Sequence, residues 1–78
     1  LDNFNDFYDP RLKRRNLAHL RQAELVEGDI RDAALLERLF SSGRFDGVIH
    51  LAAMAGVRPS LKDPLHYEDV NVRGTLLI

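Results

Sequence analysis

The sequence predicts part of an α/β domain, in which helices alternate with the strands of a doubly wound parallel sheet. Two Asp-Pro pairs, Asp9-Pro10 and Asp63-Pro64, each place a capping carboxylate directly before a proline at the first helical position. Between them, the short and mostly apolar run 47–51 opens with a glycine, as is typical of a parallel strand that is covered on both faces. Strands that alternate with helices favour right-handed crossovers and a parallel sheet.

The elements follow from local patterns, in the order helix 10–22, strand 23–26, helix 33–41, strand 47–51 and helix 65–78. The first helix has a thin apolar side, whereas the second repeats leucine and phenylalanine on one face. Asp32 caps that second helix, and Ser42-Gly43 ends it. Because two strands are too few for an independent sheet, residues 1–78 are expected to be an interior slice of a larger domain.

Composition narrows the class of protein. The chain has 78 residues, 45% of them hydrophobic and 29% charged, which is typical of a folded globular protein. The net charge of −1 argues against a nucleic-acid module, which would carry a basic face. No apolar stretch approaches the roughly 20 residues that span a bilayer, and no signal peptide is recognisable. The absence of cysteine fits a cytoplasmic protein, and three scattered histidines argue against a metal site.

Three loops, at residues 1–6, 27–30 and 51–56, would lie beyond the carboxyl ends of the strands, where open α/β sheets bind their ligands. The first two hold an acid at the strand tip, and a carboxylate there can accept both hydroxyls of a ribose. The third is rich in alanine and glycine, so that a flat ring or a pyrophosphate can lie against its backbone. The pattern predicts a bound nucleotide, with Asp2 as the ribose acceptor and NAD preferred over NADP. The alternative for Asp2 is a turn or N-cap residue.

Four motifs give the chain a family resemblance: LDNFNDFYDP at 1–10 followed by Leu12-Lys13-Arg14, GDIRD at 28–32, HLAAMAGVR at 50–58 and NVRGT at 71–75. In this order and spacing they resemble nucleotide-sugar epimerases of the extended short-chain dehydrogenase/reductase superfamily, and the UDP-glucuronate 4-epimerases in particular. The resemblance implies a partial Rossmann-type fold and NAD as the cofactor. It also implies a parent enzyme, expected to be a homodimer, that epimerises C4 of a UDP-sugar through a transient 4-keto sugar, with UDP-glucuronate as the expected substrate.

The resemblance further implies roles for individual residues in the adenosine half of the NAD site. Asp2 would bind the ribose hydroxyls, and the same loop would be lined by Asn3, Phe4 and Asn5. Lys13 would reach back toward the cofactor, although the basic run 11–15 is most simply interpreted as a solvated helix face. Asp29 would accept a hydrogen bond from the adenine amino group, and Ile30 would pack on the ring.

Beyond the adenosine, the resemblance implies contacts with the rest of the cofactor and with the substrate. The residues that would run under the pyrophosphate and the nicotinamide ribose are Leu51, Ala52, Ala53 and Met54, the last in place of an expected Gln. Asn71 would point to the floor of the active site, or else bridge backbone groups. Arg58 would contact the sugar nucleotide, or else be only a loop residue. His50 is expected to be a structural histidine, packed or hydrogen-bonded within its strand.

The family's catalytic residues are not expected in this chain. Its glycine-rich pyrophosphate loop would lie before Leu1, and its Ser/Thr and Tyr-x-x-x-Lys groups would lie beyond Ile78. Neither Tyr8 nor Tyr67 has a lysine four residues later. The chain alone is therefore expected to be inactive and to bind NAD weakly. Two alternatives remain open, a part of a sugar-nucleotide 4,6-dehydratase and a truncated piece with only a binding or assembly role.

Overall fold

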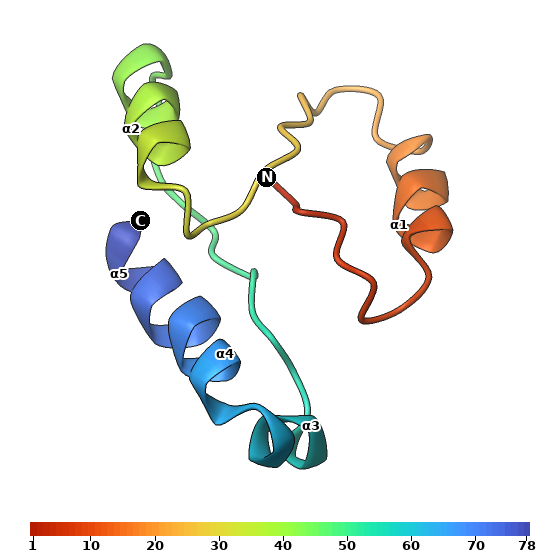
Figure 1. The fold of residues 1–78 in the computed structure, drawn as a ribbon. Helices are drawn as coiled ribbons and strands as arrows, with labels where there is room; N and C mark the ends of the chain where they lie inside the picture. Colours follow the sequence, from red (N-terminus) through yellow and green to blue (C-terminus); the bar gives the residue numbers. More distant parts are fainter.

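The computed structural model describes residues 1–78 as helices joined by extended loops (Figure 1). The helical elements are α1 (Pro10–Leu17), α2 (Ala33–Ser42), α3 (Val57–Lys62), α4 (Pro64–Glu68), the π-helical turn η1 (Asp69–Arg73) and α5 (Gly74–Leu77). The last three follow one another without a break and form one rod, the C-terminal helix (64–77). α1 stands on one side of the molecule, and α2 lies beside the C-terminal helix on the other side.

Carboxylate caps begin three of the helices where the sequence predicts them. The side chains of Asp9, Asp32 and Asp63 each accept a backbone N–H from the first turn of the helix that follows. A cap of this kind contributes about 1 kcal/mol, because it satisfies one of the backbone donors that the first turn leaves unpaired. The predictions of a helix over 33–41 and of a last helix after Asp63 are confirmed, and the former continues one residue further, to Ser42.

The predicted end of the first helix is wrong. α1 ends at Leu17 instead of Gln22, and turns follow at residues 18–19 and 21–22. α1 contains no buried residue, and Leu20 is largely exposed just beyond it. A short helix is marginal in water unless its apolar face is packed, so the thin apolar side of this segment does not sustain further turns.

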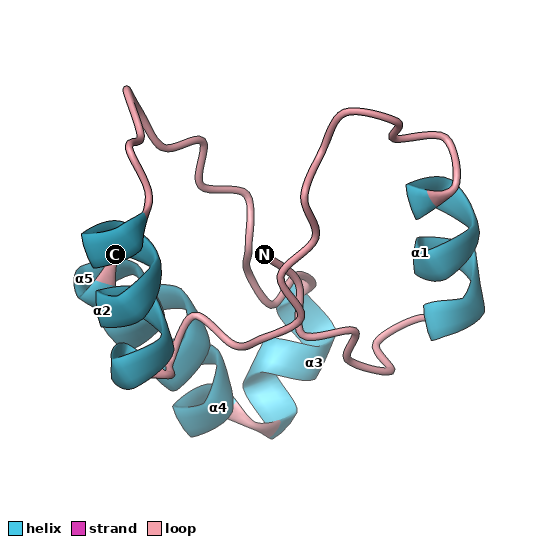
Figure 2. Ribbon diagram, turned by 90° about the horizontal axis from the view of Figure 1, so that it is seen from above, coloured by secondary structure: helices cyan, strands magenta, loops and turns pink.

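The predicted strands 23–26 and 47–51 do not form, and Figure 2 shows no strand in the chain. The one trace of a sheet is a parallel bridge between Asp2 and Glu27, closed by backbone hydrogen bonds of 3.0 and 3.2 Å. Strands are stable only within a ladder of several strands, and no other segment pairs with 47–51, where Ile49 is 88% exposed. The expected partial parallel sheet is therefore not seen in this chain, although the bridge has the parallel sense that the sequence predicts.

Side chains of the C-terminal helix hold the segment 50–55 in place of a strand ladder. Tyr67, Asn71 and Thr75 are spaced by four residues and so lie on one face of the helix. They bind the segment in turn, with Tyr67 donating to Ala55 O at 2.7 Å, Asn71 bonding Met54 and Thr75 lying 3.0 Å from His50 Nε2. The predicted structural role of His50 is confirmed by this hydrogen bond, which joins it to a helix and not to a neighbouring strand.

The buried apolar side chains are few: Phe4, Ile30, Leu36 and Val70. Ile30 packs directly on Gly74, where a Cβ atom would lie 2.6 Å from Ile30 Cδ1. The absence of a side chain at residue 74 therefore lets the C-terminal helix approach the loop that contains Ile30. None of the helices is long and apolar enough to cross a membrane.

The sequence patterns do not predict α3 (Val57–Lys62). Val57 and Leu61 are its only apolar pair at helical spacing, and a proline inside a short segment argues against a helix. Pro59 is tolerated because it lies in the first turn, where a backbone N–H has no partner within the helix. Gly56 begins the helix with φ 99°, a left-handed value that favours glycine and that lets the small-residue loop turn sharply into α3.

Candidate functional site

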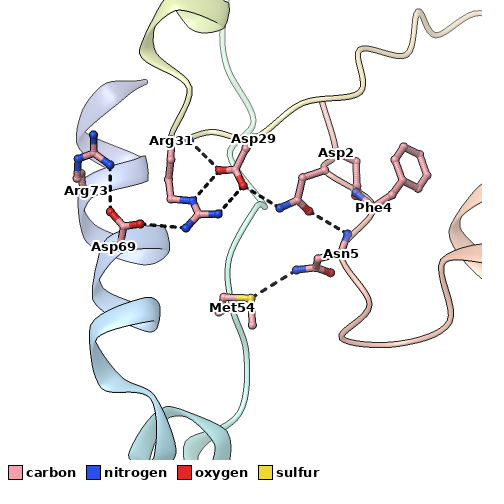
Figure 3. Close-up of polar contacts among 9 residues, drawn as sticks. Asp2, Phe4, Asn5, Asp29, Arg31, Met54, Asp69 and Arg73 are labelled. Atoms are coloured by element: carbon pink, nitrogen blue, oxygen red, sulfur yellow. Dashed lines mark hydrogen bonds and ion pairs between the residues drawn. The ribbon is translucent and has the colours of Figure 1, made fainter.

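The sequence predicts three crossover loops at the strand ends: the first at residues 1–6, the second at 27–30 and the third at 51–56. They meet at one place in the structure (Figure 3). The first loop binds the second, since Asn3 Nδ2 donates to Asp29 Oδ2 at 3.0 Å. It also binds the third, because Asn5 Nδ2 lies 3.4 Å from the sulfur of Met54. Loops that are 26 and 49 residues apart in the chain are thus brought together without a continuous sheet beneath them.

Local hydrogen bonds give the first loop its shape. Asp2 Oδ1 accepts the Phe4 N–H at 2.7 Å, and Asn3 Oδ1 accepts the Asn5 N–H at 3.2 Å, so two overlapping Asx turns fold residues 2–5. Phe4 has φ 49°, a left-handed value that is uncommon for a residue with a large side chain. Phe4 is 9% exposed, and its ring lies under the guanidinium of Arg14, with 4.3 Å between the ring centroid and Cζ. This burial and contact hold the left-handed backbone in place.

Lys13 reaches from α1 to the first loop. Its Nζ donates to Asp2 Oδ1 at 3.1 Å and to Asn5 Oδ1 at 3.2 Å, and its side chain is only 12% exposed. The ammonium also lies 5.2 Å from the centroid of the Tyr8 ring. Lys13 is therefore part of the loop's hydrogen-bond network and not a solvated side chain, while its contact with a cofactor stays a prediction.

Asp2 retains an oxygen that is available to a ligand. Oδ1 accepts from Phe4 and from Lys13, whereas Oδ2 takes part in no hydrogen bond, and the side chain is 43% exposed. Partial burial opposes ionisation, but the Phe4 N–H and the Lys13 ammonium outweigh it and hold the pKa of Asp2 below its usual value. Asp2 is thus a charged acceptor at neutral pH, and an oriented carboxylate oxygen of this kind suits a ribose hydroxyl.

Asp29, by contrast, is fully engaged within the chain. Oδ1 accepts the backbone N–H and the Nε–H of Arg31, and Oδ2 accepts from Arg31 Nη2 and from Asn3 Nδ2, at 2.8 to 3.0 Å. An ionised carboxylate has about four acceptor positions, so all of them are filled. Hydrogen bonds from the Arg31 side chain are the main cause that holds the pKa of Asp29 well below its usual range.

Asn71 bridges the backbone of the small-residue loop. Its Oδ1 accepts the Met54 N–H at 2.7 Å, and its Nδ2 donates to Met54 O at 2.9 Å. Of the two roles considered for Asn71, the structure shows the backbone bridge. The adjoining residues Leu51, Ala52 and Ala53 are exposed, and Leu51 is 87% so, which leaves this stretch open to a ligand along one side.

Two of the predicted site residues lie apart from this cluster. Ile30, expected on an adenine ring, turns its side chain to Gly74 and is 6% exposed. Arg58 is exposed in the first turn of α3 and makes no side-chain hydrogen bond or ion pair with the chain. The structure therefore joins Asp2, Asn3, Asn5, Lys13, Asp29, Met54 and Asn71, and leaves Arg58 outside the group.

Sequence reasoning misses two residues of the network, Arg31 and Asp69. Arg31 Nη1 donates to Asp69 Oδ2 at 2.9 Å across 38 residues of chain. Arg31 lies inside the GDIRD motif, whereas Asp69 stands two residues before the NVRGT motif. Nothing in their local sequence pairs them, since only the packing of the C-terminal helix on the second loop brings them into contact.

Residues 2–78 match the GDP-mannose 4,6 dehydratase family, and the chain belongs to that family. It is 53% identical over 76 residues to UDP-glucuronate 4-epimerase 3 of Arabidopsis thaliana, an alignment that covers 95% of this chain and 18% of the relative. It is 43% identical over 79 residues to the UDP-glucuronate 4-epimerase of Thermodesulfobacterium geofontis, an alignment that covers 97% of this chain and 24% of the relative. It is also 47% identical over 58 residues to UDP-glucose 4-epimerase 4 of Oryza sativa subsp. japonica, and this alignment covers 74% of this chain and 16% of the relative.

These relatives confirm the resemblance to NAD-dependent nucleotide-sugar epimerases and dehydratases that the four motifs predict. The chain spans less than a quarter of the length of each of them, and 18% of the Arabidopsis protein. The family implies a Rossmann fold for the whole protein.

Proposed function

We propose that this chain is part of an NAD-dependent UDP-glucuronate 4-epimerase and that it carries the adenosine half of the NAD site. The names of two relatives, at 53% and 43% identity, support the substrate and the reaction. The observation that carries the site is the ionised Asp2, whose Oδ2 is unbonded and which lies where three crossover loops meet. A cytoplasmic, homodimeric protein is part of the same proposal.

The residues of the cluster fit the adenosine part of NAD. Asp2 Oδ2 would accept a ribose hydroxyl, and the loop formed by Asn3, Phe4 and Asn5 would lie beside the ribose. Lys13 would neutralise part of the loop's charge while it keeps Asp2 oriented. The pyrophosphate would run along the open side of 51–54, and Arg58 would meet the sugar nucleotide beyond it.

NAD, when bound, supplies the hydride acceptor and donor that a C4 epimerisation requires. The reaction oxidises the sugar C4, turns the keto sugar over and returns the hydride to its other face. The part of this chain would be to bind and orient: Asp2 would hold the ribose, and Asn71, which fixes the loop at Met54, would keep that loop in place beside the rest of the cofactor. The groups that move protons are expected on other parts of the whole protein.

A chimera tests whether the segment can bind NAD. In it, the 76 aligned residues of the Arabidopsis UDP-glucuronate 4-epimerase 3 are replaced by those of this chain. The chimera is expected to bind NAD and to convert UDP-glucuronate to its C4 epimer, with the unaltered Arabidopsis enzyme as the control. A chimera that unfolds cooperatively but binds no NAD would contradict the proposed site.

A sugar-nucleotide 4,6-dehydratase is the second candidate, because the matching family is described by the GDP-mannose 4,6 dehydratases. Both reactions begin with oxidation at C4, so the same cofactor half serves either one. The product distinguishes them, since an epimerase returns the hydride to C4 and a dehydratase leaves a 4-keto-6-deoxy sugar. Incubation of the whole protein with UDP-glucuronate and with GDP-mannose, followed by product analysis, decides between the two.

Gly74→Ala in the chimera is expected to lower the thermal unfolding midpoint. The new Cβ would lie 2.6 Å from Ile30 Cδ1, and overpacking of this kind costs about 1–3 kcal/mol. The gain in helix propensity from Gly to Ala is about 1 kcal/mol, and the clash outweighs it because Ile30 is buried and its side chain has little room to move aside. Gly47→Ala is the control, because a Cβ there meets no atom within 4 Å. An equal or higher midpoint for Gly74→Ala would show that the helix does not pack on Ile30.

A further inference from the structure

A chain of charged side chains links the second crossover loop to the C-terminal helix (Figure 3). Arg31 contacts Asp29 through Nη2 at 2.8 Å and Asp69 through Nη1 at 2.9 Å. Asp69 in turn accepts from Arg73 Nη1 at 3.1 Å, four residues further along the helix. Figure 3 shows Arg31 between the two carboxylates, one on the loop and one on the helix.

The geometry around Arg31 fixes the plane of the Asp29 carboxylate. Nε and Nη2 bond Oδ1 and Oδ2, at 2.9 and 2.8 Å, as the two parallel bonds of an arginine–carboxylate fork. The third side-chain bond of Arg31, to Asp69, prevents the guanidinium from rotating away with its partner. The Arg31 and Asp29 side chains are 29% and 26% exposed, so water screens the fork less than it would a fully exposed ion pair.

Asp69 belongs to the same helical turn as Asn71. η1 (Asp69–Arg73) is π-helical, a geometry that occurs mostly as single turns and frequently at functional sites. From this turn Asp69 holds the second loop through Arg31, and Asn71 holds the third loop through Met54. Both loops therefore take their positions from one turn of one helix.

One of the four bonds on Asp29 comes from a residue other than Arg31. It is the bond from Asn3 Nδ2 to Oδ2, and its donor is a primary amide with the same hydrogen-bonding character as the exocyclic amino group of adenine. Because Arg31 fills the other three positions, Oδ2 is the one oxygen at which an external donor can replace a protein donor without breaking the fork.

We propose that Arg31 and Asp69 are positioning residues for nucleotide-base recognition: they hold the Asp29 carboxylate so that Oδ2 faces the adenine amino group, which takes the place of Asn3. The proposal rests on the proposed NAD site and adds how its base specificity is set. Arg31 orients Asp29, Asp69 anchors Arg31 to η1, and Asn3 occupies the bond while the base is absent.

The test compares two dinucleotides in the NAD-free chimera by calorimetric titration. One is NAD, and the other is its hypoxanthine analogue, in which a carbonyl oxygen replaces the adenine amino group and would face the Asp29 carboxylate. The unaltered chimera is expected to prefer NAD by about tenfold or more, the value of one hydrogen bond to a charged group. Asp69→Asn and Arg31→Lys are each expected to reduce this preference at least about threefold, because lysine cannot reproduce the fork.

Matched variants separate positioning from stability and from the NAD site itself. Arg73→Gln removes the exposed partner of Asp69 and should leave the preference unchanged, and Asp69→Glu should restore most of it. An unaltered preference in both Asp69→Asn and Arg31→Lys, with a lost preference in Asp29→Asn, would overturn the positioning role while keeping Asp29 as the base acceptor. If Asp29→Asn also keeps the preference, the assignment of Asp29 to adenine fails, and the positioning role fails with it.

Discussion

Asp2→Asn in the chimera is expected to weaken NAD binding about tenfold to a hundredfold and to reduce the preference for NAD over NADP. A hydrogen bond from a ribose hydroxyl to a charged oxygen contributes about 1.5–3 kcal/mol, and the substitution replaces that oxygen with an amide donor. The amide oxygen can still accept from Phe4 and Lys13, so the loop is expected to keep its shape. The Lys13 ammonium then loses its charged partner and attracts a 2′-phosphate, which Asp2 repels.

Titration calorimetry with NAD and with NADP measures both affinities. Asp6→Asn is the matched control, because Asp6 is an exposed acid of the same loop whose side chain makes no hydrogen bond. It changes the net charge equally and should leave both affinities nearly unaltered. An unchanged ratio of NAD to NADP affinity in Asp2→Asn would remove Asp2 from the ribose role.

The second large effect concerns the 78 residues on their own, which are expected to show a broad, non-cooperative thermal transition and little or no NAD binding. Buried apolar side chains number four, whereas Ile49, Leu51 and Leu65 are each more than three-quarters exposed. A core of this size cannot offset the conformational entropy of ordering the chain. The sequence also contains no glycine-rich loop ahead of a helix, the usual backbone cradle for a pyrophosphate.

Circular dichroism during heating and an NAD titration of the 78-residue chain provide the measurement. The chimera is the control, since the same residues are surrounded there by the rest of a Rossmann domain. A sharp cooperative transition together with micromolar NAD affinity would contradict the expectation. Such a result would also favour an independent binding role for the chain.

α2 and the C-terminal helix are predictable from sequence because their signals are local. Asp32 and Asp63 stand directly before the segments that they cap, and the leucines of α2 repeat at helical spacing within ten residues. The strands are not predictable in this way, because a strand is stable only when it pairs with other strands that are distant in the sequence. In the Rossmann order 3-2-1-4, residues 1–3 and 26–28 would end strands 2 and 3, which are adjacent, and they form the observed bridge. Residues 47–51 would be strand 4, whose neighbours in that order are not among these 78 residues.

The residues of the candidate site likewise divide into those that have a local sequence signal and those that have none. Asp2, Lys13 and Asp29 are predictable because they stand at strand tips or in motifs, and the structure brings their loops together. The left-handed backbone of Phe4 has no sequence signal, since glycine is the residue that would announce it. The Arg31–Asp69 pair joins positions that are 38 residues apart, and no spacing rule reaches that far.

The three bonds from Tyr67, Asn71 and Thr75 to the segment 50–55 also limit which insertions and deletions the gene can tolerate. One residue added between Tyr67 and Asn71 would change the angular positions of Asn71 and Thr75 around the helix axis relative to Tyr67. Asn71 and Thr75 would then turn away from Met54 and His50, even though every side chain was still present in the sequence. In this stretch the number of residues is therefore as constrained as their identity, and reading-frame-preserving indels should be more damaging here than most substitutions.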